Sequence, residues 1–328
     1  MKPALYLPNF RDKITVEEID AFAAVAEELE FDSIWVLDRI AVPEASDRGE
    51  LKKSFGFISE FGRSLPVSSH AEYLHAMPLV PYLAAITKKI RIGTSVIVTP
   101  LRASAVMAAE MATWDQLSRG RINVGIGSGW MPEEFETASA GHLYAKRNLH
   151  VRETIEIMKG IWTQPLFEYH GELNSFQKCG FGTKPVQRPH PPLYFGGIGK
   201  PEIAAEMISK YGLQGWIGAL DPPEAIANWR TAIAGELARL GSPKAIDGLE
   251  LASQFPFQIT KEKTDQTPRG KMSSNLVGTA AQITDNLKRY RDAGLTMALF
   301  WPPFSGVTSA ESIDHLKRLR QEIWPKIE

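Results

Sequence analysis

Short apolar runs alternate with stretches of helical periodicity along almost the whole chain of 328 residues, and this alternation constrains the fold more than any single motif. Each run is too short for a helix and has the length of a strand, whereas the stretches between them carry apolar residues at helical spacing. The strand candidates are 4–8, 33–37, 90–98, 121–126, 192–196, 214–218, 249–253 and 296–301, and the helical candidates are 15–29, 78–88, 103–118, 144–163, 200–211, 222–240, 279–293 and 309–324.

A regular order of strand and helix implies parallel strands with right-handed crossovers and helices covering the sheet. Eight such units favour a closed (β/α)8 barrel over an open doubly wound sheet. Strands buried on both faces should be nearly continuous apolar runs, as SIWVL at 33–37 and TMALFW at 296–301 are. We therefore predict a single α/β domain over residues 1–328, a (β/α)8 TIM barrel.

Three of the helical stretches begin with recognisable start signals. Thr15 is followed by Glu18 at the spacing of a capping box, Asp221 stands ahead of Pro222, and Thr279 precedes an alanine-rich turn. These positions are expected to be the first turns of their helices.

Long inserts interrupt the alternation at 39–77, 164–191 and 254–278. The first and third connect a strand to the following helix, so they are expected at the C-terminal mouth, where barrels place active sites. The second lies between the fourth helix and the fifth strand. The polar stretch 261–275 is a candidate for mobility.

The charge balance and the cysteine count exclude several classes of protein. With 37 basic and 38 acidic residues the net charge is −1, which provides no general field for nucleic acid or an anionic membrane. A single cysteine, Cys179, excludes an intramolecular disulfide and fits a reducing compartment. There is no signal-peptide pattern and no apolar segment near the ~20 residues of a membrane helix. A soluble cytoplasmic protein is expected, with no metal, because no histidines have a ligand spacing such as H-x-x-x-H.

The stretch RINVGIGSGWMPEEF at 121–135 is similar to a nucleotide-binding glycine loop. A dinucleotide fingerprint requires G-x-G-x-x-G and an acid about 20 residues later, but position 130 is tryptophan and the region near 147 is basic. A phosphate-binding Walker A loop also needs Gly-Lys-Ser/Thr, which does not follow. Two interpretations remain. In the first, a flat ring approaches the backbone of Gly127 and Gly129; in the second, the glycines only form the turn before the helix at Pro132.

A second glycine cluster, GGIGKPE at 196–202, follows the fifth strand and opens a helix. Backbone N–H groups at a helix N-terminus suit a phosphate, and Lys200 adds a positive charge. The alternative is again a tight turn.

Three segments together resemble the luciferase-like superfamily of flavin- and F420-dependent oxidoreductases. They are FDSIWVLDRIAVP (31–43), the continuous run from 90 to 136 that contains SVIVTPLRAS and LSRGRINVGIGSGW, and KPVQRPHPPLYFGGIG with YGLQGWIG (184–199 and 211–218). The resemblance implies a (β/α)8 barrel, often dimeric, with reduced FMN or F420 at the C-terminal mouth. It also implies a non-prolyl cis peptide bond behind the cofactor ring, at Ser95–Val96.

The resemblance assigns roles residue by residue. Asp38, Arg39 and Trp130 are the catalytic candidates, of which Asp38 and Trp130 are also expected to line the ring. The cofactor-binding candidates are Ser95, Val96, Thr99, Gly127 and Gly129 near the ring, Gly196, Gly197, Ile198 and Gly199 at the phosphate, Arg147 near the cofactor tail, and Trp216 at the pocket boundary.

One position departs from the family pattern, which usually has Asp-His where this chain has Asp38-Arg39. Histidine titrates near neutral pH, whereas arginine keeps its proton. Arg39 could instead stabilise negative charge on a reduced flavin, a peroxide or an anionic substrate through charge-assisted hydrogen bonds. The alternative is a loop ion pair with Asp38 or Glu44. His70 and His75 in the first insert could supply the missing imidazole, or could be ordinary loop residues.

The favoured function is a flavin-dependent monooxygenase that uses reduced FMN and oxygen on a small organic substrate. A separate flavin reductase would supply the cofactor, because the chain has no obvious NAD fingerprint. The alternatives are an F420-dependent enzyme that transfers hydride without oxygen, and a non-catalytic flavin-binding protein. A homodimer is expected from the resemblance, whereas neither nucleic acid nor a membrane is an expected partner.

Overall fold

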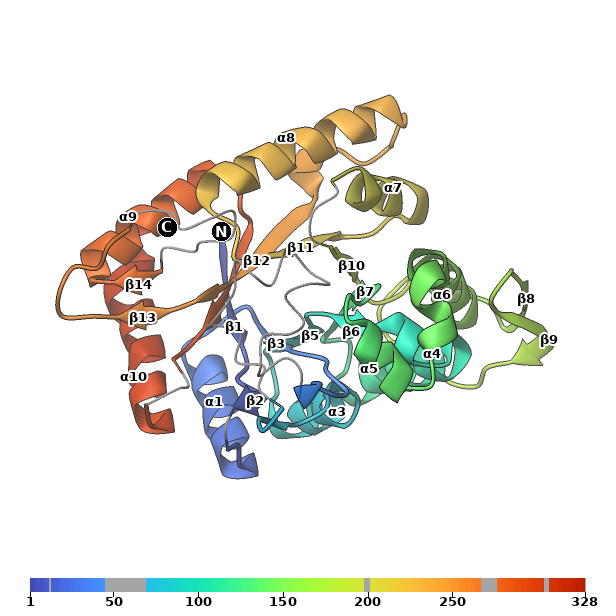
Figure 1. Cartoon of the computed structure of the whole chain (residues 1–328), viewed down its shortest axis with the longest axis horizontal. Coiled ribbons are helices and arrows are strands. Elements are labelled where there is room, and N and C mark those ends of the chain that lie inside the picture. Colours follow the sequence, from blue (N-terminus) through green and yellow to red (C-terminus); the bar gives the residue numbers. More distant parts are fainter. Residues whose placement is uncertain (12, 45–68, 198–200, 267–275, 304–306, 328) are drawn as a thin grey trace.

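The computed structural model describes the chain except for residues 12, 45–68, 198–200, 267–275, 304–306 and 328. Its centre is a barrel of parallel strands, which confirms the predicted (β/α)8 fold (Figure 1). In chain order the barrel strands are β1 (Lys2–Tyr6), β3 (Ser33–Val36), β5 (Arg91–Thr94), β7 (Ile122–Gly127), β10 (Leu193–Gly196), β11 (Gly215–Ala219), β12 (Glu250–Pro256) and β15 (Met297–Trp301).

The barrel closes between β7 and β10, where Val124 pairs with Leu193 and Gly127 pairs with Gly196. The predicted third strand, 90–98, is divided in two, because the chain leaves the sheet after β5 and returns as β6 (Ile97–Val98), which pairs with the end of β7. Two residues, Ser95 and Val96, form this break.

The helices surround the strands as the alternation predicted (Figure 1). Capping boxes formed by Thr15 with Glu18 and by Thr279 with Gln282 begin two of them. Asp221 does not cap the helix that follows it: the N-cap position is Pro222, and the Asp221 carboxylate accepts a hydrogen bond from Ala219 N instead. The covering helices are α1 (Val16–Glu28), α3 (Ala76–Ile86), α4 (Ser104–Leu117), α6 (Arg147–Thr163), α7 (Pro201–Tyr211), α8 (Pro223–Arg239), α9 (Ala280–Asp292) and α10 (Ser309–Arg318).

Alternate residues of each strand belong to two different cores, as a closed barrel requires. The larger core lies between strands and helices and includes Phe255 and Phe300. The smaller core fills the barrel and includes Tyr6, Trp35 and Trp301. The interior is therefore packed, and only its C-terminal end can receive a ligand.

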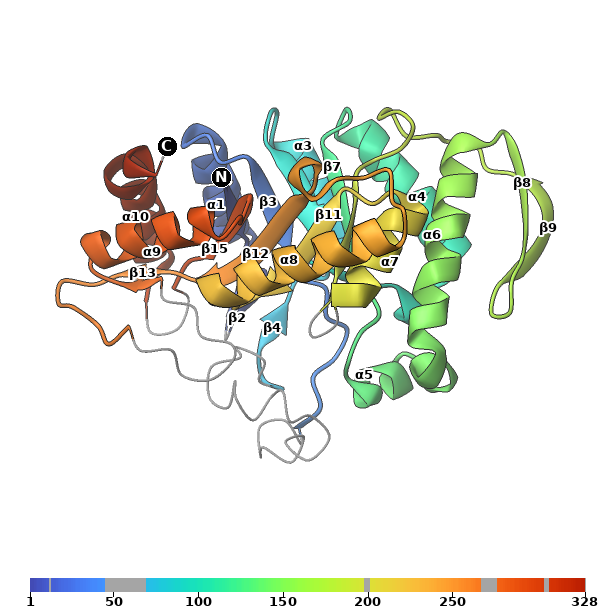
Figure 2. The ribbon, with the colours of Figure 1, turned by 90° about the horizontal axis from the view of Figure 1, so that it is seen from above.

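The inserts and the connection after β1 add small elements outside the barrel. β2 (Phe10–Arg11) pairs with β4 (Glu72–Tyr73), and β13 (Gln258–Ile259) pairs with β14 (Val277–Gly278). In Figure 2, β2 and β4 lie with the short helix α5 (Pro132–Thr137) along the lower side, which is the end where the barrel strands terminate. The second insert forms an antiparallel hairpin, β8 (Leu166–His170) and β9 (Ser175–Gly180), on the outer side of α6. No helix in the described part of the chain is both long and apolar enough to span a membrane.

Candidate active site

Asp38 and Arg102 form a buried ion pair at the C-terminal end of the barrel. The Asp38 carboxylate receives two hydrogen bonds from the Arg102 guanidinium, at 2.6 and 2.7 Å, and a third from Val98 N at 3.0 Å. Its side chain has no exposed surface. Asp38 follows β3 and Arg102 follows β6, so the pair joins two loops of the mouth. Both carboxylate oxygens of Asp38 are thus hydrogen-bonded to the protein, and a catalytic role for Asp38 stays a prediction.

A second buried ion pair, between Arg39 and Glu134, joins the loop after β3 to helix α5. Arg39 Nη1 donates to Glu134 Oε2 at 2.7 Å, and Ile40 N donates to the other carboxylate oxygen at 2.7 Å. The guanidinium also lies over the Trp130 ring, 5.2 Å from its centroid. Arg39 is therefore ion-paired, as in the alternative hypothesis, but its partner is Glu134 rather than Asp38 or Glu44.

The peptide bond Ser95–Val96 is cis, as the family resemblance implied. The Ser95 carbonyl accepts a hydrogen bond from the hydroxyl of Tyr6, which is buried inside the barrel. Burial raises the pKa of Tyr6, and the nearby charge of Arg39 opposes this rise. Tyr6 and Ser95 consequently meet at the C-terminal end of the barrel interior.

The glycines at the ends of β7 and β10 make room for Val96. A Cβ at Gly127 would lie 2.7 Å from Val96 Cγ2, and a Cβ at Gly196 would lie 2.5 Å from Val96 Cγ1. Gly129, at φ +71°, is in the left-handed region, and a Cβ there would meet Val98 at 2.6 Å. The protein's own side chains therefore occupy the positions that a Cβ would take at these glycines, and the approach of a ring to the backbone of Gly127 and Gly129 stays a prediction.

We expect Gly127→Ala to lower the free energy of unfolding by about 1–3 kcal/mol, because the added methyl group overpacks Val96. Urea unfolding measures this loss. Gly182→Ala is the control, since a Cβ at Gly182 meets no atom within 4 Å. Equal stability of the two variants would show that Val96 yields without cost.

The loop after β10 is anchored by Trp216 of β11, whose side chain points outward from the barrel. Trp216 Nε1 donates to Gly197 O at 2.8 Å, and the indole stacks on Trp229 of α8 with a centroid separation of 4.4 Å. We had expected Trp216 to bound the pocket, but it packs in the core between strands and helices, so any contribution to binding acts through Gly197. Two further phosphate candidates, Ile198 and Gly199, lie outside the described residues.

Arg147 is connected to the loop after β7 through Tyr144. Arg147 Nη1 donates to Tyr144 O at 2.9 Å, and its guanidinium lies 4.5 Å from the centroid of the Tyr144 ring. The Tyr144 hydroxyl donates to Trp130 O at 3.0 Å. The structure thus places Arg147 beside the site residues, in contact with a tyrosine that orients the Trp130 backbone.

Some buried polar atoms near the ends of the strands have no hydrogen-bond partner among the described residues. They include Arg39 Nε, Thr99 Oγ1 and Gln254 Oε1. Gln254 pairs in register with Ala219 and with Leu299, a member of the interior core, so its side chain points into the barrel. Buried polar atoms are nearly always satisfied in proteins, and a bound molecule would supply the missing partners.

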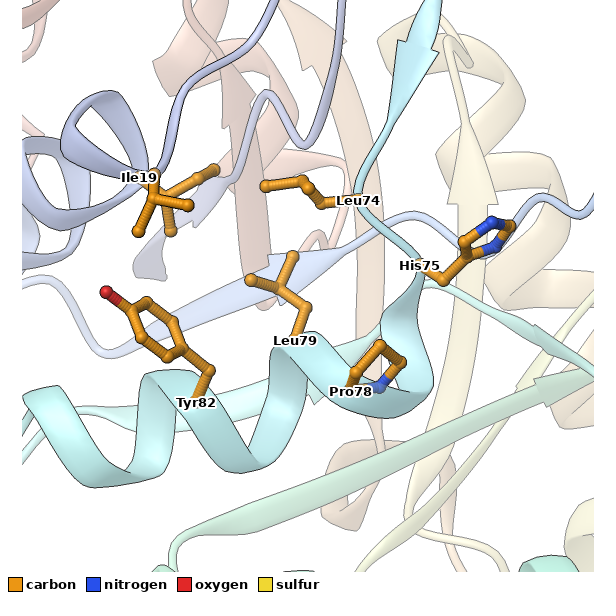
Figure 3. A pocket seen from close by; sticks show the side chains of 7 residues that line it. Ile19, Leu74, His75, Pro78, Leu79 and Tyr82 are labelled. Atoms are coloured by element: carbon orange, nitrogen blue, oxygen red, sulfur yellow. The ribbon is translucent and has the colours of Figure 1, made fainter.

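An apolar hollow of about 240 Å³ lies on the flank of the barrel, between the first turns of α1 and α3 (Figure 3). Ile19, Leu74 and Leu79 line it together with Tyr82, and His75 stands at one end. His75 precedes α3 as its N-cap residue without a capping side-chain hydrogen bond. A role for this imidazole at the barrel mouth stays a prediction. Among the described residues no cluster of histidine, cysteine or carboxylate side chains could hold a metal ion.

Comparison with known proteins identifies relatives over most of the chain. The sequence model of the family described as luciferase-like monooxygenase matches residues 4–267. The chain is 36% identical over 129 residues to an FMNH2-dependent dimethylsulfone monooxygenase of Pseudomonas putida, covering 39% of this chain and 35% of the relative. It is 24% identical over 246 residues to the pyrimidine monooxygenase RutA of Allorhizobium ampelinum, covering 74% and 64%. The chain thus spans less than two thirds of the length of these curated relatives.

Solved structures share the fold over the full length of the chain. The monooxygenase RslO1 from Streptomyces bottropensis has a TM-score of 0.77 at 16% identity, covering 100% of both chains. An F420-dependent secondary alcohol dehydrogenase has a TM-score of 0.75 at 17% identity, covering 100% of this chain and 99% of the other. At these identities the likeness shows the barrel fold alone.

Proposed function

Because the chain belongs to the luciferase-like monooxygenase family, as its sequence predicted, we propose that it is a flavin-dependent monooxygenase acting on a small organic substrate. When bound, reduced FMN would supply two electrons to O2, so that one oxygen atom would enter the substrate and the other would leave as water. The observation that carries the proposal is the group of buried polar atoms at the C-terminal end of the barrel that have no partner among the described residues, because a bound molecule would supply hydrogen bonds to them.

The residues of this end fit a flat cofactor with a phosphate tail. Val96 would support the ring, since its side chain is fixed between Gly127 and Gly196. The phosphate would bind near Gly197, whose carbonyl Trp216 anchors, just before α7 begins at Pro201. The two buried ion pairs keep the loops after β3, β6 and β7 at fixed positions around the ring.

An F420-dependent oxidoreductase is the second candidate. An F420-dependent alcohol dehydrogenase and an F420-dependent tetrahydromethanopterin reductase share the fold, but at 17% and 16% identity. The stronger sequence match is to an enzyme whose name specifies FMNH2. This difference favours FMN. A non-catalytic flavin-binding protein is the third candidate.

The proposed partners are a separate flavin reductase and a second copy of the chain, in the cytoplasm. The name of the Pseudomonas relative specifies the reduced cofactor, which a reductase would deliver. Large apolar side chains that stand exposed on the neighbouring helices α3 and α4 support a homodimer. They are Ile86, Val106 and Leu117, at 39%, 59% and 58% exposure.

Anaerobic titration with reduced FMN, oxidised FMN and F420, followed by calorimetry, tests the proposal. We expect reduced FMN to bind at least tenfold more tightly than F420. A preference for F420 would transfer the assignment to hydride transfer, and binding of neither would refute both. Admission of oxygen with a panel of small substrates then separates an enzyme from a binder, since only the enzyme forms an oxygenated product.

A further inference from the structure

The charges at the mouth of the barrel cancel in pairs. Arg39 is paired with Glu134 at 2.7 Å, and Arg102 is paired with Asp38 at 2.6 Å. All four side chains are at least 85% buried, so water screens these charges weakly. An anionic substrate that approaches Arg39 would also meet the Glu134 carboxylate, and burial of an additional unpaired charge is costly.

Arg39 nevertheless has one buried hydrogen-bond donor, Nε, that is not used within the described part of the chain. Glu134 occupies Nη1, and Trp130 lies against one face of the guanidinium, whereas the buried Nε has no partner among the described residues. Arg39 lies just after β3, at the C-terminal end of the barrel, and its side chain is only 8% exposed. Nε is therefore a donor whose position is fixed by two contacts before anything binds.

A second polar group faces the interior from three strands away. Gln254 on β12 is separated from β3 by β15 and β1, and its Oε1 is buried without a partner in the described part of the chain. Its amide is neutral, so it adds hydrogen-bonding capacity without adding charge.

We propose that the substrate of this enzyme is a neutral molecule with an oxygen atom that accepts a hydrogen bond from Arg39, and that Glu134 excludes anionic analogues. This inference rests on the proposed function, since it assigns the substrate class of the same site. It also revises the sequence-based hypothesis that Arg39 serves an anionic substrate, because the guanidinium charge is already compensated by Glu134.

The test compares dimethyl sulfone with methanesulfonate, which have similar shapes but differ by one negative charge. Binding of each to the anaerobic complex with reduced FMN is measured by calorimetry. We expect the wild-type protein to bind dimethyl sulfone at least about tenfold more tightly. Preference for methanesulfonate, or binding of neither compound, would overturn the proposal.

Glu134→Gln provides the decisive variant. Glutamine can still accept from Ile40 N but leaves the Arg39 charge uncompensated, so methanesulfonate should bind about tenfold more tightly than to the wild type while dimethyl sulfone changes little. A gain of binding cannot arise from misfolding. Glu136→Gln, on the same helix but exposed, is the matched control and should change neither affinity. An unchanged selectivity in Glu134→Gln would refute the role of the ion pair.

The outcomes also separate this inference from the proposed function. If the wild-type protein did not bind reduced FMN, the proposed function would be contradicted. The same two probes would then be measured on the free protein, where Arg39 and Glu134 are still paired and the same order of affinities is expected. If Glu134→Gln altered only the affinity for reduced FMN, Arg39 would serve the cofactor and the substrate assignment would be wrong.

Discussion

Arg102→Met should lower the free energy of unfolding by about 3–5 kcal/mol, because it leaves the buried carboxylate of Asp38 without a counter-charge. Two of the three hydrogen bonds to Asp38 are lost, and only Val98 N still donates to it. Urea unfolding measures the change. Binding of reduced FMN should weaken as well, since the pair connects the loops after β3 and β6.

Two controls separate the buried charge from other causes. The double variant Arg102→Met with Asp38→Asn removes the charge but keeps an acceptor for Val98 N, so it should recover part of the lost stability. Lys146→Met breaks an ion pair whose side chains are 54% and 60% exposed, and should cost about 0–1 kcal/mol. Losses of equal size in Arg102→Met and Lys146→Met would contradict the argument.

The order of strands and helices could be predicted from the sequence because burial imposes periodicity within each element. Capping boxes at Thr15 and Thr279 are equally local, since both partners lie within one turn. The break in the predicted third strand has no periodic signature. It was anticipated only through the family resemblance, which located the cis bond at Ser95–Val96.

The contacts that build the site could not be predicted, because their partners are far apart in sequence. Asp38 and Arg102 are separated by 64 positions, and Arg39 and Glu134 by 95. Glu134 could be interpreted from sequence only as an acid in the first turn of a helix. Tyr6 belongs to an apolar run, in which nothing marks its hydroxyl as the donor to Ser95 O.

The orientation of side chains along a barrel strand could not be predicted from the sequence either. Both faces of the strands are buried, so the apolar pattern does not distinguish the interior from the helix layer. The resemblance placed Trp216 at the pocket boundary, although its side chain faces α8. The resemblance alone therefore does not decide which of the assigned residues face the cofactor site.

Asp221 is a buried acid that the site does not use, and it should make the stability of the protein depend on pH. Its carboxylate accepts from Ala219 N at 3.0 Å and from Ser253 Oγ at 3.4 Å. It lies on the α8 side of β11, where a Cβ at Gly218 would meet both Asp221 and Trp216. Burial raises the pKa of Asp221 from its ordinary 3.8 to about 7, against the opposing effect of these hydrogen bonds.

The sign of the effect follows from the protons bound in each state. Between pH 3.8 and 7 the folded protein holds a proton on Asp221 that the unfolded chain has lost, so the free energy of unfolding falls as pH rises through this window. Above the folded pKa the decrease is complete, at on the order of 4 kcal/mol. Asparagine keeps an acceptor for Ala219 N but has no charge to bury.

We therefore expect Asp221→Asn to be more stable than the wild type at pH 8, and its advantage to be about 2–3 kcal/mol larger at pH 8 than at pH 5. Urea unfolding of both proteins at the two pH values gives this difference, in which the other titrating groups cancel. Asp292→Asn, at a side chain that is 65% exposed, should show no such widening. A constant difference between Asp221→Asn and the wild type would mean that Asp221 is ionised in the folded protein throughout, and that its hydrogen bonds from Ala219 and Ser253 outweigh the cost of burial.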